Sequence, residues 1–225
     1  MITITIDWWA GTWKWTTAKW VAKALWYQYI DTWAMYRWVA LAIIERGISP
    51  ENEHDVTKVA ESLFFRYTYN QSTDVFDVII NDQNREADIR TPQVSAIVHI
   101  IAQYSGVRKH LVAQQQRLWK QWWVVFDWRD GWTVIAPHAQ LKVHLLCDLE
   151  VRARRRQRDY ELQWKNIALD DIKKNLYERD QKDLYGPDAT NSIAKDAIDI
   201  DTTNLTIDQQ IEKIVQISKK LLISF

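Results

Sequence analysis

The sequence predicts a three-layer α/β fold built on a parallel β-sheet. Short apolar or β-branched runs of strand length alternate with longer stretches of helix length along most of the chain. The run Val124–Asp127 is apolar without interruption and ends at an acidic residue, as a central parallel strand does. Two similar runs follow it, at Leu141–Leu146 and at residues 197–201. Strands that alternate with helices in this way favour a parallel sheet with helical crossovers.

The elements of the first part of the chain follow in order. Residues 2–6 alternate Ile and Thr and end at Asp7, which predicts a buried strand. A loop and a helix that begins near Thr16 come next. Residues 27–31 predict a second strand, and residues 32–46 predict a helix that Gly47 closes.

The middle of the chain predicts a helix at residues 55–62 and then two short strands, at residues 63–69 and 75–81, joined by a turn. From the pattern alone, an ordinary edge hairpin accounts for these strands. Further helices are predicted from Thr91 to about Tyr104, at residues 107–120, 150–163 and 169–182, and at the amphipathic segment 207–222.

Composition excludes some classes of function. The chain has 29 basic and 29 acidic residues, so no overall field favours nucleic acid or an anionic membrane. The most apolar region, residues 20–44, is interrupted by charged side chains, so no membrane span is predicted. The single cysteine, Cys147, forms no internal disulfide, and no secretory leader is present. Both features favour a reducing cytoplasm.

A candidate phosphate-binding loop lies near the N-terminus, in the stretch ITITIDWWAGTWKWTTAK at residues 2–19. It has the strand, loop and helix of such a site, whose pattern is G-x-x-x-x-G-K-[ST]. Gly11, Lys14 and Thr16 are in place, although a lone loop lysine is otherwise a solvated charge. The strict pattern fails because tryptophans stand where small residues are expected, at Trp8, Trp13 and Trp15.

Six further blocks occur in a fixed order: IDTWAMYRWVALAI (30–43), DIRTPQVS (88–95), VR (107–108), DWRDGWTVIAPHAQLKV (127–143), RARRR (152–156) and ERDQKD (178–183). Together with the loop they resemble the bacterial cytidylate kinases, over nearly all of the chain. The resemblance implies a single P-loop kinase domain, residues 1–225, with a five-stranded parallel sheet flanked by helices. It also implies an inserted monophosphate-binding lobe at about residues 60–97 and a helical lid at about residues 150–186.

The resemblance implies phosphoryl transfer from ATP to CMP or dCMP, with Mg²⁺, by a cytoplasmic monomer that binds small nucleotides and neither membrane nor nucleic acid. It assigns catalytic roles to Lys14, Arg129 and Arg179. It assigns the ATP phosphates to Gly11, Thr12, Lys14, Thr16 and Arg155, and the metal to Thr16. The basic run at residues 152–158 would begin the lid, although a solvated face or an RNA-facing stripe would have the same composition.

The same resemblance assigns CMP binding to Thr32, Arg37, Arg108, Asp130 and Asp183. Arginines grip phosphate bidentately, and carboxylates accept from an exocyclic amine or from sugar hydroxyls. Some positions depart from the family pattern on this side: His99 replaces a serine, His138 an aspartate and Gly186 an arginine.

The larger departure is in the tryptophans, 14 against five glycines. Usual glycine positions of the family are occupied by Trp8, Trp13, Trp15, Trp26, Trp33, Trp122, Trp123, Trp128 and Trp132, and Trp9 stands at a proline. Glycine serves such loops through positive φ or close backbone approach, which tryptophan does not provide. We therefore expect crippled activity. The alternatives are a catalytically dead or designed variant of the scaffold, and a binding module that stacks single-stranded bases on tryptophan.

Overall fold

A computed structural model describes residues 2–7, 9–70, 75–120, 123–127, 131–162, 164–185 and 193–223. Two compact units make up the chain. Met1–Tyr27 and Val124–Phe225 form the first unit, and Gln28–Trp123 form the second. The second unit is therefore an insertion between the first and second halves of the first unit. It contains the segment 60–97 that the sequence assigns to a monophosphate-binding lobe.

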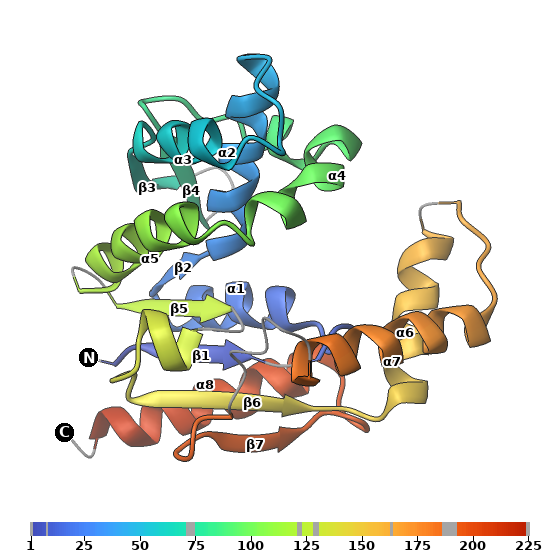
Figure 1. The fold of residues 1–225 in the computed structure, drawn as a ribbon. Helices are drawn as coiled ribbons and strands as arrows, with labels where there is room; N and C mark the ends of the chain where they lie inside the picture. Colours follow the sequence, from blue (N-terminus) through green and yellow to red (C-terminus); the bar gives the residue numbers. More distant parts are fainter. Residues whose placement is uncertain are drawn as a thin grey trace. The chain divides into compact units, whose positions relative to one another are not determined.

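The main sheet has five strands in the order β2-β5-β1-β6-β7 (Figure 1). Their bounds are Ile4–Asp7 for β1, Gln28–Ile30 for β2, Val124–Asp127 for β5, Leu141–Leu146 for β6 and Ile198–Asp201 for β7. β1 pairs in parallel with β5 and β6, and β6 pairs in parallel with β7. Ile6 lies opposite Asp127, so Asp7 and Asp127 stand at the carboxyl ends of adjacent strands. The predicted α/β class with a parallel sheet flanked by helices is confirmed.

The helices of the first unit are α1 (Lys14–Leu25), α6 (Leu149–Glu161), α7 (Leu169–Tyr185) and α8 (Ile207–Ile223). α1 packs against α8, and α6 packs against α7 (Figure 1). β1 is buried along its whole length, because residues on both sides of the strand face apolar neighbours. β5 and β6 are buried in the same way, although β6 includes Lys142 and His144, which pair with Asp196 and Asp199.

The sequence did not predict the short π-helical turn η2, Gly131–Ile135, which follows β5. The Trp132 side chain is fully buried there, and its ring lies edge-on to His144 with the centroids 6.0 Å apart. A single turn of five residues is too short to show helical periodicity, so no sequence pattern indicated it.

The second unit consists of α2 (Thr32–Glu45), α3 (Glu53–Glu61), the hairpin of β3 (Phe65–Asn70) and β4 (Val75–Ile80), the turn η1 (Asp88–Arg90), α4 (Pro92–Ile101) and α5 (Ser105–Trp119). Its core surrounds α2, which is apolar on most of its circumference and contacts α3, α4 and η1. Met35, Val39 and Phe65 are among the fully buried side chains of this core. None of the described helices is long and apolar enough to span a lipid bilayer.

The tryptophans do not share one environment. Trp38 and Trp132 are buried, Trp9, Trp13 and Trp33 are partly buried, and Trp15, Trp20, Trp26, Trp123 and Trp164 are exposed. Trp8, Trp122 and Trp128 lie outside the described residues. The rings are therefore neither a common core nor one continuous exposed platform within the described part of the chain.

Trp26 closes the C-terminus of α1 in the left-handed conformation, with φ at 60°. Its side chain is 82% exposed, so little packing offsets the backbone strain. Glycine is the usual residue at such a helix end because it has no Cβ atom. Trp26→Gly is therefore expected to raise the free energy of unfolding by about 0.5–1 kcal/mol, because relief of strain exceeds the added flexibility of the unfolded chain. Urea denaturation of the variant and the parent chain measures the difference.

Trp20 provides the matched control, since it is an exposed tryptophan inside the same helix. Trp20→Gly is expected to lower the free energy of unfolding by about 0.5–1 kcal/mol, because glycine disfavours a helix interior. A loss of stability in both variants would contradict the assignment of strain to Trp26.

Candidate active site

The loop between β1 and α1 has two residues in the left-handed region, Gly11 with φ at 84° and Trp13 with φ at 56°. Gly11 also packs closely on α6. A Cβ atom at this position would lie 3.1 Å from the Cβ of Arg152 and 3.2 Å from its backbone oxygen. A side chain there would be crowded by α6 and strained by the positive φ. Trp13 is the N-cap of α1, and its side chain makes no capping hydrogen bond.

Lys14 begins α1, and its Nζ lies 2.8 Å from Oδ1 of Asp7. The Asp7 carboxylate is fully buried at the end of β1, and its Oδ2 has no hydrogen-bond partner among the described residues. By helix geometry, the first N–H groups of α1 have no intrahelical acceptor, which makes this helix end favourable for an anion. The loop thus brings together a lysine, a helix N-terminus and a buried carboxylate.

A cavity of about 530 Å³ opens beside this loop, entirely within the first unit. The carboxyl ends of β1 and β5 contribute Asp7 and Asp127, and the loop contributes Gly11, Lys14 and Thr16. The rings of Trp9, Trp13 and Trp15 also line it. The opposite side comes from α6 and α7, which provide Arg156, Asp159, Tyr160, Asp171, Asn175, Arg179 and Asp183.

The polar residues of α7 that line the cavity recur every fourth position, at Asp171, Asn175, Arg179 and Asp183. Residues four apart share a helix face, so one side of α7 faces the cavity. Sequence reasoning selected Arg179 and Asp183 but missed Asp171 and Asn175. The four-residue spacing was the signal that would have found them.

The loop is supported from behind by α8. The side chain of Gln210 is fully buried, and its Nε2 donates to the backbone oxygen of Thr12 at 3.2 Å and to Oγ1 of Thr17. The Thr12 hydroxyl turns into the loop and donates to the backbone oxygen of Trp9 at 2.9 Å. Thr12 therefore shapes the loop through its hydroxyl. Sequence reasoning missed Gln210, because the two partners are far apart in the chain.

Arg155, which the sequence assigns to ATP phosphates, is buried behind the loop, whereas Arg156 lines the cavity. The guanidinium of Arg155 donates to the backbone oxygens of Thr202 and Leu205 at 2.7 and 3.3 Å. Its Cζ lies 4.0 Å from the centroid of the Trp13 ring, as in a cation–π pair. Burial lowers the pKa of Arg155. The Trp13 ring is thus held between the cavity and a buried cation.

The residues assigned to CMP lie in both units. Thr32 begins α2 in the second unit, and its buried hydroxyl has no hydrogen-bond partner. Arg37, one and a half turns further along α2, donates to the backbone oxygen of Ile89 at 3.1 Å and to Oγ of Ser95 at 3.0 Å. Burial, with the nearby charge of Arg90, lowers the pKa of Arg37.

Arg108 is partly buried on α5, also in the second unit. Asp183 belongs to the first unit, where it lines the cavity. Arg129, Asp130 and Gly186 lie outside the described residues.

A cluster of charges at the start of α2 was not selected from the sequence. Asp31 caps α2 by accepting from the N–H of Ala34 at 2.9 Å, and its other oxygen lies 3.3 Å from Arg90. Arg90 also pairs with Glu86. Burial raises the pKa of Glu86, and the charge of Arg90 opposes this rise. Arg90 stands inside the DIRTPQVS block, which was the available signal.

The cavity can accommodate a hard cation together with an anionic ligand. The described residues contain no cluster of three His, Cys, Asp or Glu side chains that would hold a metal alone. Mg²⁺ usually keeps several waters and binds one or two carboxylates together with substrate phosphates. Asp7 with its unpartnered Oδ2, Asp127 and the Thr16 hydroxyl supply oxygens of this kind at one end of the cavity. The donor set therefore fits a Mg²⁺ that arrives with phosphate.

Comparison with known proteins gives consistent results. A family described as "Cytidylate kinase" matches residues 4–220. The chain is 37% identical over 217 residues to a protein named cytidylate kinase from Cytophaga hutchinsonii, covering 96% of this chain and 93% of that protein. It is 38% identical over 221 residues to the cytidylate kinase of Bacillus cytotoxicus, covering 98% and 97%. For the cytidylate kinase of Flavobacterium johnsoniae, identity is 35% over 219 residues, covering 96% and 95%.

Proposed function

Because the chain belongs to the cytidylate kinase family, we propose that it transfers the γ-phosphoryl group of ATP to CMP or dCMP, giving ADP and CDP or dCDP. The observation that carries this proposal is the placement of Lys14. It stands at the N-terminus of a helix, at the carboxyl end of a central parallel strand, in a cavity large enough for the phosphates of a nucleotide. Phosphoryl transfer depends mainly on positioning and on compensation of charge, which this arrangement supports.

On the donor side, Lys14 and the first N–H groups of α1 would receive the β- and γ-phosphates of ATP. Lys14 must then exchange its partner, leaving Oδ1 of Asp7 for a phosphate oxygen. Arg179 lines the cavity from α7. Its positive charge would stabilise the negative charge that shifts between the phosphates during transfer. The Thr16 hydroxyl, with Asp7 and Asp127, would hold Mg²⁺, which when bound neutralises charge on the phosphates.

On the acceptor side, Arg37 and Arg108 would grip the phosphate of CMP. Arg37 is already oriented by its hydrogen bonds to Ile89 and Ser95, so little rotamer freedom remains to be lost on binding. The hydroxyl of Thr32, buried without a partner, would gain one from the ligand. Asp130 and Asp183 would accept from the base or from sugar hydroxyls. We propose that the protein acts as a cytoplasmic monomer on these small molecules.

Turnover is proposed to be slow. The rings of Trp13 and Trp15 line the cavity beside Lys14, at positions where the family has glycine. The Trp13 ring is held on the guanidinium of Arg155, so it cannot swing away without losing that contact. The rings would narrow the space for the phosphate chain.

The test is direct measurement of CDP by ion-exchange chromatography, after incubation with ATP, Mg²⁺ and CMP. Slow formation of CDP that requires both CMP and Mg²⁺ is expected, and UMP or AMP in place of CMP should give less product. Hydrolysis of ATP without CDP would refute the proposal. So would the absence of CDP both from this chain and from a variant whose loop tryptophans are replaced with glycine.

A further inference from the structure

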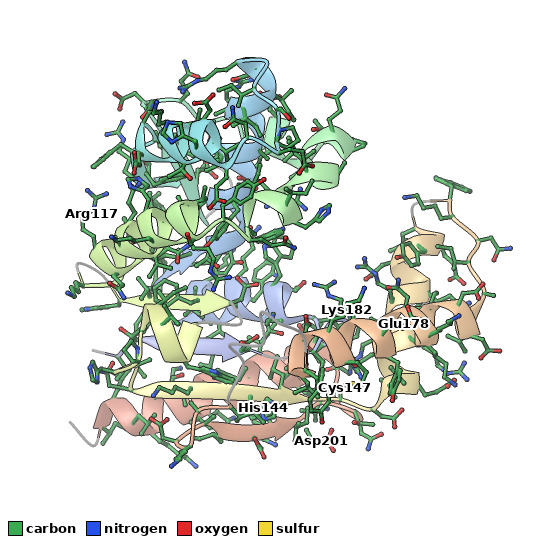
Figure 2. All side chains as sticks on the ribbon, in the orientation of Figure 1. Arg117, His144, Cys147, Glu178, Lys182 and Asp201 are labelled. Carbon is green, nitrogen blue, oxygen red and sulfur yellow. The ribbon has the colours of Figure 1, made fainter. Side chains whose placement is uncertain are left out.

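Arg152, on α6, makes contacts on two sides of the cavity although it does not line it. The residue is only 5% exposed. Its Nε donates to the backbone oxygen of Cys147 at 3.2 Å, just past the end of β6 (Figure 2). Its Nη1 donates to the backbone oxygen of Ala10 at 3.2 Å, and its Nη2 lies 2.8 Å from Oδ2 of Asp180 on α7. One guanidinium therefore joins β6, the phosphate-binding loop and α7.

On the loop side, the contact is extensive. Ala10 packs beside the small apolar cluster between α6 and α7, and the Trp9 ring centroid lies 5.5 Å from Cζ of Arg152. The backbone of Gly11 lies so close to Arg152 that a Cβ atom at residue 11 would require Arg152 to shift. The position of Arg152 thus defines where the loop backbone runs.

On the α7 side, Asp180 lies next to the face that lines the cavity. Glu178 and Lys182 are exposed on the same helix (Figure 2), whereas Asp180 is 5% exposed and points to Arg152. Asp180 directly follows Arg179 and lies three residues before Asp183. Because the three side chains project from one helix, fixing the direction of Asp180 also fixes the directions of Arg179 and Asp183. The buried apolar residues between α6 and α7 are Ala153, Ile172 and Leu176, and Leu149, Tyr160 and Leu169 pack beside them. The ion pair adds a directional contact to this apolar packing.

We propose that the Arg152–Asp180 ion pair is a positioning pair, which fixes α7 against the phosphate-binding loop so that Arg179 and Asp183 stand in register with Lys14. Neither residue touches the nucleotide in this proposal. They act through the Ala10 backbone on one side and through the orientation of α7 on the other. The consequence for catalysis rests on the proposed kinase function, whereas the mechanical coupling between loop and helix does not.

Stability alone does not account for the pair. Removing two charges from water costs about as much as their attraction returns, so a buried ion pair is often no more stabilising than two apolar residues. Burial raises the pKa of Asp180, and the hydrogen bond and charge of Arg152 oppose this rise, so burial offsets part of what the ion pair contributes. The remaining oxygen, Oδ1, is buried and has no hydrogen-bond partner among the described residues. The pair therefore contributes more to the orientation of α7 than to the stability of the fold.

Hydrogen exchange without any ligand tests the coupling. Asp180→Asn is expected to speed hydrogen exchange of the backbone amides at residues 14–18 by about tenfold, which is the usual size of a coupling between two sites. The midpoint of urea denaturation should stay nearly unchanged, because the opening is local. Glu150→Gln is the matched control. It removes an exposed carboxylate that pairs with Arg154 and Lys173 at the same α6–α7 contact, and it should leave those amides unchanged.

If Asp180→Asn fails to fold, the double variant Arg152→Met/Asp180→Leu removes both charges together and should show the same faster exchange. A response confined to α6 and α7, with the loop amides unaffected, would overturn the proposal. Kinetics supply the second readout: kcat/KM for ATP should fall about tenfold in Asp180→Asn and recover in Asp180→Glu, which restores the carboxylate. Faster loop exchange in a chain that makes no CDP would support the coupling and refute the kinase function separately.

Discussion

Replacing Trp13 and Trp15 with glycine is expected to raise kcat for the phosphorylation of CMP by about 100-fold or more, the range associated with restoring donors in a preorganised anion site. Two effects act together. Removing the rings opens the cavity beside Lys14, and glycine at residue 13 accepts the left-handed backbone without strain. The loop N–H groups can then align on the phosphates. Initial rates of CDP formation at saturating ATP and CMP measure the gain.

The control for this prediction is Trp164→Gly. Trp164 also has positive φ, at 60°, but its side chain is 97% exposed and does not line the cavity. This substitution should leave kcat unchanged. An equal rate in the parent chain and in Trp13→Gly/Trp15→Gly would mean that the rings do not limit turnover.

Removal of the loop lysine has the second large effect. In the Trp13→Gly/Trp15→Gly background, Lys14→Met is expected to lower kcat/KM for ATP by about 10²–10³-fold, because a cation aimed at the transferring phosphates is lost. Lys19→Met is the control on the same helix, since Lys19 belongs to α1 but does not line the cavity. CDP formation at varied ATP concentrations gives both constants.

Lys14→Met also leaves the buried Asp7 carboxylate without its cation, which would destabilise the fold. Urea denaturation of Lys14→Met measures that loss of stability separately from the loss of catalysis, and leaves Asp7, which is proposed to hold Mg²⁺, in place. Unchanged kcat/KM in Lys14→Met would rule out Lys14 as a phosphate ligand.

Much of the fold could be predicted because the central strands β1, β5 and β6 are buried. The predicted bounds of β5 and β6, Val124–Asp127 and Leu141–Leu146, are those of the structure, although β6 includes the buried polar residues Lys142 and His144. The start of α1 was predicted two residues late, near Thr16, because Trp13 is not a usual N-cap residue. For the site, ligands bind beyond the carboxyl ends of parallel strands, and this rule selects Asp7, Asp31 and Asp127 from the sequence. Asp7 and Asp127 line the cavity, whereas Asp31 caps α2.

The parts that could not be predicted depend on contacts between distant segments. The bond from Gln210 to Thr12 joins residues 198 positions apart, and no local pattern indicates it. Arg155 belongs to the basic run that was expected to begin the lid, and it was assigned to the ATP phosphates, yet it is buried and donates to the backbone oxygens of Thr202 and Leu205. Helical periodicity shows that the side chains of Arg155 and Arg156 point in different directions from α6. It does not show which of the two points to the cavity.

The order of the strands and helices of the first unit along the chain affects how this unit folds during synthesis. β1 pairs only with strands from the second half of the chain, β5 and β6, and the support behind Thr12 comes later still, from α8. The intervening unit, Gln28–Trp123, is continuous and contains its own core, so it is expected to fold first as the chain leaves the ribosome. During translation, the second unit would therefore be folded while the proposed nucleotide site is still incomplete. The segment that forms β1 would remain unpaired, exposed and prone to aggregation until nearly all of the first unit had been synthesised.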